Sequence, residues 1–356
     1  MILGAPDVVR AQVWLGGQEF ELREFAVPEL APGEALVAVD LATICGSDLH
    51  TVSGRRPGAH PGILGHEVVG HVVAVADEAP AGVDGVALQV GDRVVWSVTS
   101  ACGTCDRCAA GRSAKCRALL KTGHEPLDGP WPLSGGHASH VHLRAGTAAV
   151  RVPSEIPDAS AAMAACALAT ACACVEAAAG PGLGGARVLV VGAGMLGLCA
   201  AALARSAGAV SVAVAELDPE RAHRARELGA DTVITPPATP EGGVDVAIEL
   251  SGHPDGVALA IGALDVGGRA ALAGSVTPGA PVPIDPERVV RRHLGIVGVH
   301  NYEPRHLAAA VDFLAESGAA YDWPGLVADP VALDDLPAAF ASPVGGILRR
   351  SITPAS

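Results

Sequence analysis

Four cysteines lie close together in one turn-rich segment of this 356-residue chain. The run Cys102-Gly-Thr-Cys105-Asp-Arg-Cys108 is followed, after seven intervening residues, by Cys116. Four closely spaced thiolates satisfy a tetrahedral zinc ion completely and leave no coordination position open for chemistry. Two-cluster ferredoxins share the opening spacing but close it with a three-residue gap and a proline, whereas Arg117 follows Cys116 here. The spacing therefore predicts a structural zinc site, with free thiols or another metal as the alternatives.

A glycine motif with nucleotide-binding spacing lies near the middle of the chain. Residues 187–191 have the pattern of a short apolar strand, and Gly192-Ala193-Gly194-Met195-Leu196-Gly197 follows directly and opens an alanine- and leucine-rich helix. Such glycines permit a tight turn and close approach of the backbone to a pyrophosphate, whose charge the helix N-terminus favours. The motif predicts a dinucleotide site, and a tight strand-to-helix turn without a ligand is the alternative.

A carboxylate stands where a ribose-binding acid is expected. The next predicted strand, 210–215, ends at Glu216, about twenty residues beyond the glycines. Its side chain can accept hydrogen bonds from the ribose hydroxyls and would repel a 2′-phosphate, so NAD is expected rather than NADP. Arg221 and Arg224 follow closely enough to keep NADP as the less favoured alternative.

The elements that must position these residues change in character along the chain. Residues 8–152 contain short valine-rich strands broken by Gly, Pro and Asp, which predicts a mostly β region. From about Pro157, apolar strands alternate with helical stretches, which indicates a parallel, doubly wound sheet. The expected strands of this second part lie at 187–191, 210–215, 245–250 and 269–273. A helix near 304–317 and a terminal strand near 346–352 end the chain.

Two further segments complete the pattern of a known family. They are Cys45-Gly46-Ser47-Asp48-Leu49-His50 and Gly62-Ile63-Leu64-Gly65-His66-Glu67-Val68-Val69-Gly70. With the four cysteines and the glycine motif, they resemble the zinc-containing medium-chain dehydrogenases along nearly the whole chain. The resemblance implies an α/β fold with a GroES-like, β-rich catalytic domain at 1–156, including a structural zinc lobe at about 100–117. It further implies a Rossmann NAD-binding domain at 157–299, a C-terminal return to the catalytic domain at 300–356, and an active cleft between the domains.

The resemblance also implies the ligands of a catalytic zinc. Cys45, His66 and Cys166 would hold the ion, and water or substrate would take the fourth position. Glu67 would be an occasional direct ligand, and Asp48 would orient the ligand histidine. Polyol dehydrogenases of the superfamily often have Glu where Cys166 stands, so this chain looks more similar to the alcohol dehydrogenase pattern.

The implied chemistry is reversible hydride transfer between an alcohol and NAD. Zinc makes a bound alcohol more acidic, and Ser47 and His50 resemble the relay that carries the proton to solvent. A surface role for His50 is the alternative. Thr170 is included with the glycine motif among the candidate cofactor-binding residues. Two zinc ions per chain are expected, and the remaining cysteines, Cys172, Cys174 and Cys199, are expected in the apolar core.

Three segments are similar to a subgroup of these enzymes associated with phosphonate metabolism. They are residues 121–125, 131–136 and 298–302. This resemblance implies a small hydroxyalkyl phosphonate or the matching aldehyde as substrate, with a cationic group near the zinc. Lys121, His124 and Arg292 are the candidates, and ordinary surface charge is the alternative for each. By the same pattern Val98 would face the substrate and leave a roomy pocket.

Composition limits the partners. Half of the residues are hydrophobic and the formal net charge is −14, so a nucleic-acid partner is not expected. Residues 1–15 lack a secretory signal pattern, and the alanine-rich run 159–175 is expected as a buried helix and not a membrane span. A cytoplasmic location and a small alcohol or aldehyde partner are therefore expected, and the resemblance implies a homodimer or homotetramer.

Three other functions fit parts of the pattern. A polyol or secondary-alcohol dehydrogenase would use the same mechanism. A zinc-free quinone or enone reductase shares the fold and the cofactor but needs no zinc ligands. A non-catalytic sensor would keep the nucleotide site alone. Turnover together with two zinc ions per chain would exclude the last two.

Overall fold

A computed structural model describes residues 6–179, 182–340 and 347–354, and the chain packs into two compact units. Unit 1 comprises Met1–Cys166, Glu303–Glu316 and Trp323–Ser356, and unit 2 comprises Ala167–Tyr302 and Ser317–Asp322. The domain change expected after residue 156 therefore lies somewhat earlier than the division after Cys166. Unit 1 is assembled from both ends of the chain, whereas unit 2 is nearly continuous.

Unit 1 is built on two sheets, one of three strands and one of eight. The small sheet has the order β2-β1-β4, and the large sheet has the order β16-β17-β3-β5-β6-β7, with β8 paired to β3 and β9 to β6. All of these pairs are antiparallel except that of β16 with β17. The strands are β1 (Val8–Gly16), β2 (Glu19–Ala26), β3 (Ala35–Ile44), β4 (Gly62–Ile63), β5 (Glu67–Val75), β6 (Arg93–Ser100), β7 (Leu120–Lys121), β8 (His140–Leu143), β9 (Thr147–Arg151), β16 (Val331–Ala332) and β17 (Arg350–Thr353).

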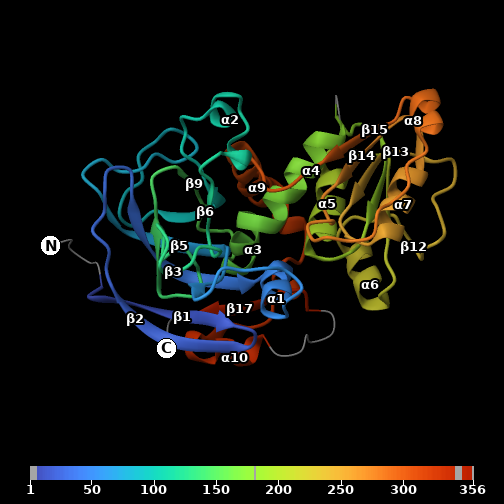
Figure 1. The fold of residues 1–356 in the computed structure, drawn as a ribbon. Helices are drawn as coiled ribbons and strands as arrows, with labels where there is room; N and C mark the ends of the chain where they lie inside the picture. Colours follow the sequence, from blue (N-terminus) through green and yellow to red (C-terminus); the bar gives the residue numbers. More distant parts are fainter. Residues whose placement is uncertain (1–5, 180–181, 341–346, 355–356) are drawn as a thin grey trace. The chain divides into compact units, whose positions relative to one another are not determined.

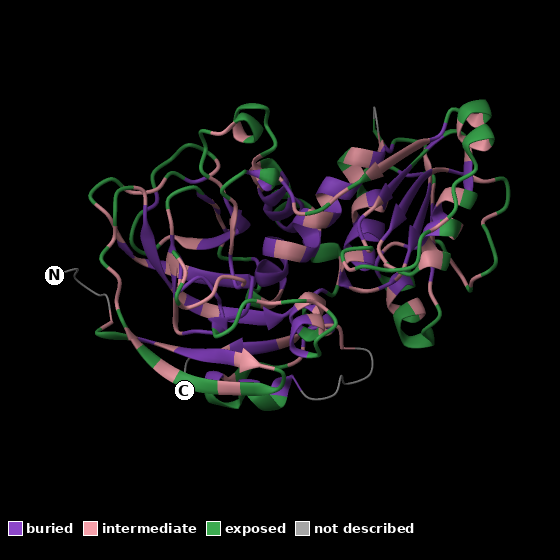
Figure 2. Ribbon diagram, in the orientation of Figure 1, coloured by how far each residue is buried: buried purple, intermediate pink, exposed green. Residues whose placement is uncertain are grey.

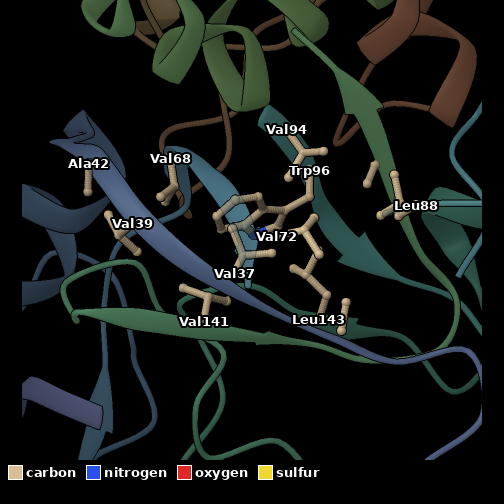
Figure 3. Packing of buried hydrophobic residues seen from close by; sticks show 12 residues of the cluster. Val37, Val39, Ala42, Val68, Val72, Leu88, Val94, Trp96, Val141 and Leu143 are labelled. Carbon is tan, nitrogen blue, oxygen red and sulfur yellow. The ribbon is translucent and has the colours of Figure 1, made fainter. Parts of the chain in front are cut away.

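The core of unit 1 lies among β3, β5 and β6. Val37, Val72 and Trp96 are at most 1% exposed and belong to one apolar cluster, and Figure 3 shows their side chains grouped together. Burying each large apolar side chain stabilises the fold by about 1.5–3 kcal/mol. Because β3 is buried along nearly its whole length, it can hold the residue at its end, Cys45, in a fixed position.

Short helices and turns of unit 1 fill the connections between strands. They are α1 (Gly46–Val52), α2 (Asp106–Ala109), η1 (Ser113–Lys115), α3 (Asp158–Met163), α9 (Pro304–Glu316), η4 (Pro324–Leu326), η5 (Leu333–Asp335) and α10 (Leu336–Ala339). The predicted helix 304–317 corresponds to α9. The predicted terminal strand corresponds to β17, and residue 346 lies outside the described residues.

Unit 2 contains the predicted parallel sheet. Its order is β12-β11-β10-β13-β14-β15 and every pair is parallel, as expected for a doubly wound fold. Figure 1 shows α4 and α5 on one face of this sheet and α7 on the other, and Figure 2 shows the strands largely buried between them. The elements are α4 (Ala169–Ala179), β10 (Arg187–Val191), α5 (Met195–Ser206), β11 (Ser211–Ala215), α6 (Pro219–Glu227), β12 (Thr232–Ile234), β13 (Val244–Glu249), α7 (Pro254–Gly262), β14 (Leu264–Leu272), α8 (Pro286–Arg292), β15 (Gly295–Gly298) and η3 (Gly318–Ala320).

The alanine-rich helix is interrupted at a critical place. Between α3 and α4 the chain forms a π-helical segment, η2 (Ala164–Leu168), with Cys166 at its centre. Single-turn π-helical segments within α-helices are frequently found at functional sites. The helical stretch Asp158–Ala179 is long and apolar enough to span a membrane by composition alone, but 67% of its most apolar window is buried within the protein. It is therefore a core helix, as the sequence predicts.

Candidate metal centres and cofactor site

The four cysteines predicted to bind structural zinc converge in a lobe after β6. The sulfur atoms of Cys102, Cys105, Cys108 and Cys116 all lie within 4.8 Å of one another. The separations include 3.4 Å for Cys102 and Cys116 and 3.6 Å for Cys105 and Cys108, and all four are free thiols. Hydrogen bonds from Thr104 lower the pKa of Cys102 to about 6, so this sulfur is ready to act as a thiolate ligand. The donor set fits a closed tetrahedral zinc site.

An ion pair within the four-cysteine lobe and a carboxylate from another segment hold the lobe in place. Arg117 pairs with Asp106 through two hydrogen bonds of 2.5 and 2.7 Å. Glu303, just before α9, accepts from the backbone N–H of Ser113 at 2.9 Å and from that of Ala114 at 3.2 Å. The second contact was not foreseen from the sequence, because almost two hundred residues separate its partners and no motif connects them.

A second cluster joins Cys45, His66 and Cys166, which we call the three-donor cluster. One ligand atom of each lies within 4.8 Å of the others. Cys45 is 5% and His66 2% exposed, whereas Cys166 is partly exposed in the π-helical segment. Two thiols and one imidazole match the three protein donors of a catalytic zinc site, in which substrate or water takes the fourth position. The residues present therefore fit the zinc ion that the sequence implies.

The charges around the three-donor cluster favour metal binding. A hydrogen bond from Cys166, together with the charges of Arg349 and His66, holds the pKa of Cys45 well below its usual value. The same shared proton raises the pKa of Cys166 well above its usual value. The lowered pKa favours the thiolate form of Cys45, and Cys166 must lose its proton when a metal ion binds.

Asp48 positions the imidazole of His66. One carboxylate oxygen accepts from the backbone N–H of Cys45 at 2.9 Å and caps α1, and the other lies 3.4 Å from His66 Nδ1. Although burial opposes it, the Asp48 charge raises the pKa of His66 well above its usual value. The raised pKa means that His66 must lose a proton before Nε2 can bind a metal ion, and the Asp48 contact at Nδ1 orients the ring for that role.

Glu67 lies beside the three-donor cluster but outside it. Its oxygens accept hydrogen bonds of 2.6 and 3.0 Å from Arg349, and one also accepts from Thr43 Oγ1 at 2.6 Å. Arg349 Nη2 also lies 3.6 Å from Cys45 Sγ. Glu67, expected as an occasional ligand, is engaged by a guanidinium in this structure. Sequence reasoning missed Arg349, because its neighbours in the chain form no motif.

The two proposed relay residues both lie on α1. Ser47 Oγ lies 3.1 Å from His66 Nε2, so its hydroxyl reaches the three-donor cluster. His50 follows one turn later, and its Nδ1 is shielded from solvent with no hydrogen-bond partner among the described residues. Burial, followed by the charge of Arg55, lowers the pKa of His50, so this imidazole is neutral at pH 7 and can accept a proton.

The candidate residues for an anionic substrate are not equivalent. His124 stacks near His66 with ring centroids 5.0 Å apart, but burial lowers its pKa to about 3, so it is neutral and not cationic. Arg292 belongs to α8 of unit 2, where it pairs with Asp265 at 2.9 Å. Lys121 ends β7. Val98 is buried on β6, and its carbonyl accepts from the Thr122 backbone N–H at 3.0 Å.

The glycine motif of unit 2 has the geometry that a nucleotide site needs. Gly192 has a φ of +94°, and a Cβ on Gly197 would lie 1.8 Å from the carbonyl oxygen of Gly192. By contrast, a Cβ on Gly194 would meet open space. Gly192 thus permits the tight turn, and Gly197 permits the close packing of α5. The space at Gly194 leaves room for a phosphate at the helix N-terminus formed by Met195 and Leu196.

Glu216 closes the same loop. Its carboxylate accepts from the backbone N–H of Ala193 at 2.7 Å and from those of Leu217 and Asp218 at 2.7 and 3.0 Å. The acid is therefore at the end of β11, next to the glycine turn, where the ribose of a dinucleotide is expected. Thr170 is partly exposed on α4.

Comparison with known proteins identifies the family of this chain. Residues 31–154 match the alcohol dehydrogenase GroES-like domain family, and residues 196–316 match the zinc-binding dehydrogenase family. An L-threonine 3-dehydrogenase of Streptomyces avermitilis is 34% identical over 340 residues, covering 91% of this chain and 93% of that protein.

Two solved structures are similar over almost the whole chain. An alcohol dehydrogenase from Thermotoga maritima aligns with a TM-score of 0.87 and 26% identity, covering 97% of this chain and 99% of that one. A zinc-binding dehydrogenase from Sinorhizobium meliloti, bound to NADP, aligns with a TM-score of 0.85 and 26% identity, covering 98% and 100%. This chain therefore belongs to the zinc-dependent medium-chain alcohol dehydrogenase family and is an oxidoreductase.

Proposed function

We propose that the enzyme uses one catalytic zinc and NAD to interconvert a small alcohol and its aldehyde or ketone. The observation that carries this proposal is the convergence of Cys45, His66 and Cys166 within 4.8 Å, from three separate segments of unit 1. These residues would hold the catalytic ion, and the four-cysteine lobe would hold a second, structural one. Bound at the three-donor cluster, zinc supplies Lewis acidity that makes a substrate hydroxyl group easier to deprotonate.

The chain's own residues would take up the proton. The Ser47 hydroxyl, 3.1 Å from His66 Nε2, can accept the proton of the substrate hydroxyl while donating its own onward. The neutral imidazole of His50, on the same helix, is the next acceptor and can release the proton to water. The substrate carbon loses a hydride to NAD⁺ in the same reaction, so the alcohol gives up two electrons and two hydrogens in total.

We propose NAD rather than NADP as the redox partner. The carboxylate of Glu216 lies at the glycine turn, where it would accept hydrogen bonds from ribose hydroxyls and repel a 2′-phosphate. Arg224 is paired with Glu227 at 2.9 Å, which reduces its capacity to bind such a phosphate. Arg221 is exposed on the same helix, α6, so the preference should be substantial and not absolute.

The finer identity of the substrate rests on three short segments. Their similarity to enzymes associated with phosphonate metabolism supports a small hydroxyalkyl phosphonate, or the matching aldehyde, as the physiological substrate. We further propose that the enzyme is cytoplasmic. We also propose that it forms a homodimer or homotetramer, since β12 and β15 are the outermost strands of the unit 2 sheet among the described residues and could pair with another chain.

One experiment tests the proposal as a whole. The purified enzyme is analysed for zinc and assayed for NADH formation with a panel of simple alcohols, polyols and hydroxyalkyl phosphonates. Two zinc ions per chain and NAD-dependent oxidation of at least one alcohol are expected. Tight NADH binding without turnover of any alcohol would instead support a nucleotide sensor and refute the proposal.

A further inference from the structure

The turn Lys121–His124 is held against the three-donor cluster by a glycine. Gly123 has a φ of +69°, and a Cβ there would lie 2.4 Å from the carbonyl oxygen of Gly65, so the turn packs directly on the backbone that precedes His66. This packing brings the His124 ring to 5.0 Å from the His66 ring. The start of the turn is fixed by the pairing of Lys121 with Thr99 of β6.

Arg56 reaches the same region from a different segment. It lies in the loop after α1, where its backbone N–H donates to the His50 carbonyl at 3.0 Å. Burial lowers the pKa of Lys121, and the nearby charge of Arg56 lowers it further. The charge of Arg56 also acts on His50 and His124, after burial and closer groups. Arg56 and Lys121 therefore share one region beside the three-donor cluster.

No ion pair joins Arg56 or Lys121 to a carboxylate among the described residues, although the charge of Glu125 partly opposes the lowering of the Lys121 pKa. In the turn itself, Glu125 uses Oε1 to accept from the backbone N–H of Lys121 at 2.8 Å. Asp48 is fully buried and directed at His66. Lys115 adds positive charge to the region, offset by Glu303.

Such an arrangement is costly without a ligand. Arg56 and Lys121 are both partly buried, and two like charges held near each other in a region of reduced solvation repel each other. Perturbed charges of this kind are concentrated at functional sites. An anion bound between the two side chains would offset both the repulsion and the lost hydration.

We propose that Arg56 and Lys121 bind an anionic group of the substrate, which makes the substrate class an alcohol with a carboxylate or phosphonate close to its hydroxyl carbon. The inference rests on the proposed function, because it assumes that the hydroxyl lies at the three-donor cluster. Arginine presents a planar fork of donors to two oxygens, and lysine adds a point charge, so together they suit either anion. The neutral His124 lies beside them and adds no charge of its own.

The test compares charged and uncharged substrates across matched variants. Steady-state kinetics are measured with 2-hydroxyethylphosphonate, 3-hydroxypropanoate and 1-propanol for the wild type, Arg56→Gln, Lys121→Met and the double variant. Each single change should lower kcat/KM for the anionic substrates by about 10- to 100-fold, mainly through KM, because one charge-assisted contact is lost. Oxidation of 1-propanol should not fall. Arg291→Gln is the matched control, since Arg291 is exposed on α8 of unit 2 and pairs with Glu287 at 2.8 Å.

Binding provides a readout that does not depend on turnover. Calorimetric titration of the zinc-loaded enzyme with methylphosphonate and with acetate should show binding that is weakened in each variant and retained in Arg291→Gln. A higher affinity for one anion, matched by a higher kcat/KM for the corresponding alcohol, identifies which of the two the site prefers. Thermal melting checks that every variant is folded.

The outcomes separate this inference from the proposed function. Wild-type kcat/KM values that are equal for all three alcohols, or undiminished in the double variant, overturn the anion site and leave the dehydrogenase assignment intact. Absence of NADH formation with any alcohol overturns the proposed function. If no alcohol is oxidised, the anion site is judged by calorimetry alone. Anion binding that persists unchanged in the double variant overturns the proposed anion site, whereas loss of binding supports it.

Discussion

The Glu67 carboxylate is held by the Arg349 guanidinium, 282 residues further along the chain, through hydrogen bonds of 2.6 and 3.0 Å. Both side chains are nearly inaccessible, at 0% and 6% exposure. A buried ion pair of this kind is expensive to break, because removing one partner leaves the other charge without compensation. The pair also brings positive charge to within 3.6 Å of the Cys45 sulfur.

Replacing Arg349 should therefore destabilise unit 1. Arg349→Met is expected to lower the free energy of unfolding by about 3–5 kcal/mol, whereas the double variant Glu67→Gln/Arg349→Met should recover much of this loss. Urea denaturation of the three proteins measures the difference. A single variant as stable as the wild type would show that the pair does not carry buried charge in solution.

The two clusters of thiols should respond differently to substitution. Cys45→Ser is expected to reduce the zinc content from two ions per chain to one and to abolish turnover, while NADH affinity is unchanged because the glycine turn belongs to unit 2. Metal analysis, kinetics and NADH titration on one preparation provide the three measurements. Turnover that survives in this variant contradicts the assignment of Cys45 as a ligand of the catalytic ion.

Cys105→Ser is the counterpart in the four-cysteine lobe. Because a structural zinc site contributes directly to folding, this variant should also lose one zinc ion but lower the melting temperature, with residual turnover in the fraction that stays folded. Thermal melting in the presence and absence of a chelator tests it. Unaltered stability would remove the reason for assigning a structural ion to the lobe.

The relay predicts a specific dependence on pH. Proton acceptance requires neutral His50, and burial with Arg55 moves its pKa below the usual 6.5. Alcohol oxidation should therefore hold its rate at mildly acidic pH and fall only as the pH drops through this lowered pKa. His50→Gln should reduce kcat/KM by about 10²-fold and remove that limb of the profile. An identical profile in wild type and variant would assign the limb to another group.

Substitutions of two glycines in the cofactor turn should have different effects, one on stability and one on NADH binding. Gly197→Ala places a Cβ 1.8 Å from a carbonyl oxygen, so it should destabilise unit 2 by at least about 1–3 kcal/mol. Gly194→Ala meets no protein atom within 4 Å and should fold normally, but it should weaken NADH binding because the methyl group occupies the space next to the helix N-terminus. Denaturation curves and calorimetric NADH titration distinguish the two effects.

Sites that depend on residue spacing within a short segment could be predicted from the sequence. Contacts between residues far apart in the sequence could not. The four-cysteine lobe and the glycine turn depend on spacing within about twenty residues, so the sequence reveals them directly. The parallel order of unit 2 followed from alternating strands and helices. The family resemblance then supplied Cys45, His66 and Cys166, which no local spacing connects.

The missing parts have physical reasons. Nothing around Arg349 or Glu303 marks these residues, because each acts on a partner that folding alone brings near. The π-helical turn at Cys166 differs from an α-helix in that its backbone hydrogen bonds span one more residue, and composition does not reveal this difference. Arg292 was an equally plausible cation in the sequence, but in the structure it forms an ion pair with Asp265. No sequence motif pointed to Arg56.

The split arrangement of unit 1 also bears on how the protein is made. Residues of β3 and β5 emerge early from the ribosome, yet β17 and Arg349 are synthesised only after the whole of unit 2. Until then, the end of β3 at Ala42 to Ile44 lacks the neighbour that β17 provides, and the buried Glu67 carboxylate lacks its guanidinium partner. Unit 2, by contrast, is almost entirely contiguous in sequence, so all strands of its sheet are synthesised earlier. The part of the enzyme that is translated first is thus completed last, and a nascent chain arrested before Arg349 carries a metal site whose surroundings are unfinished.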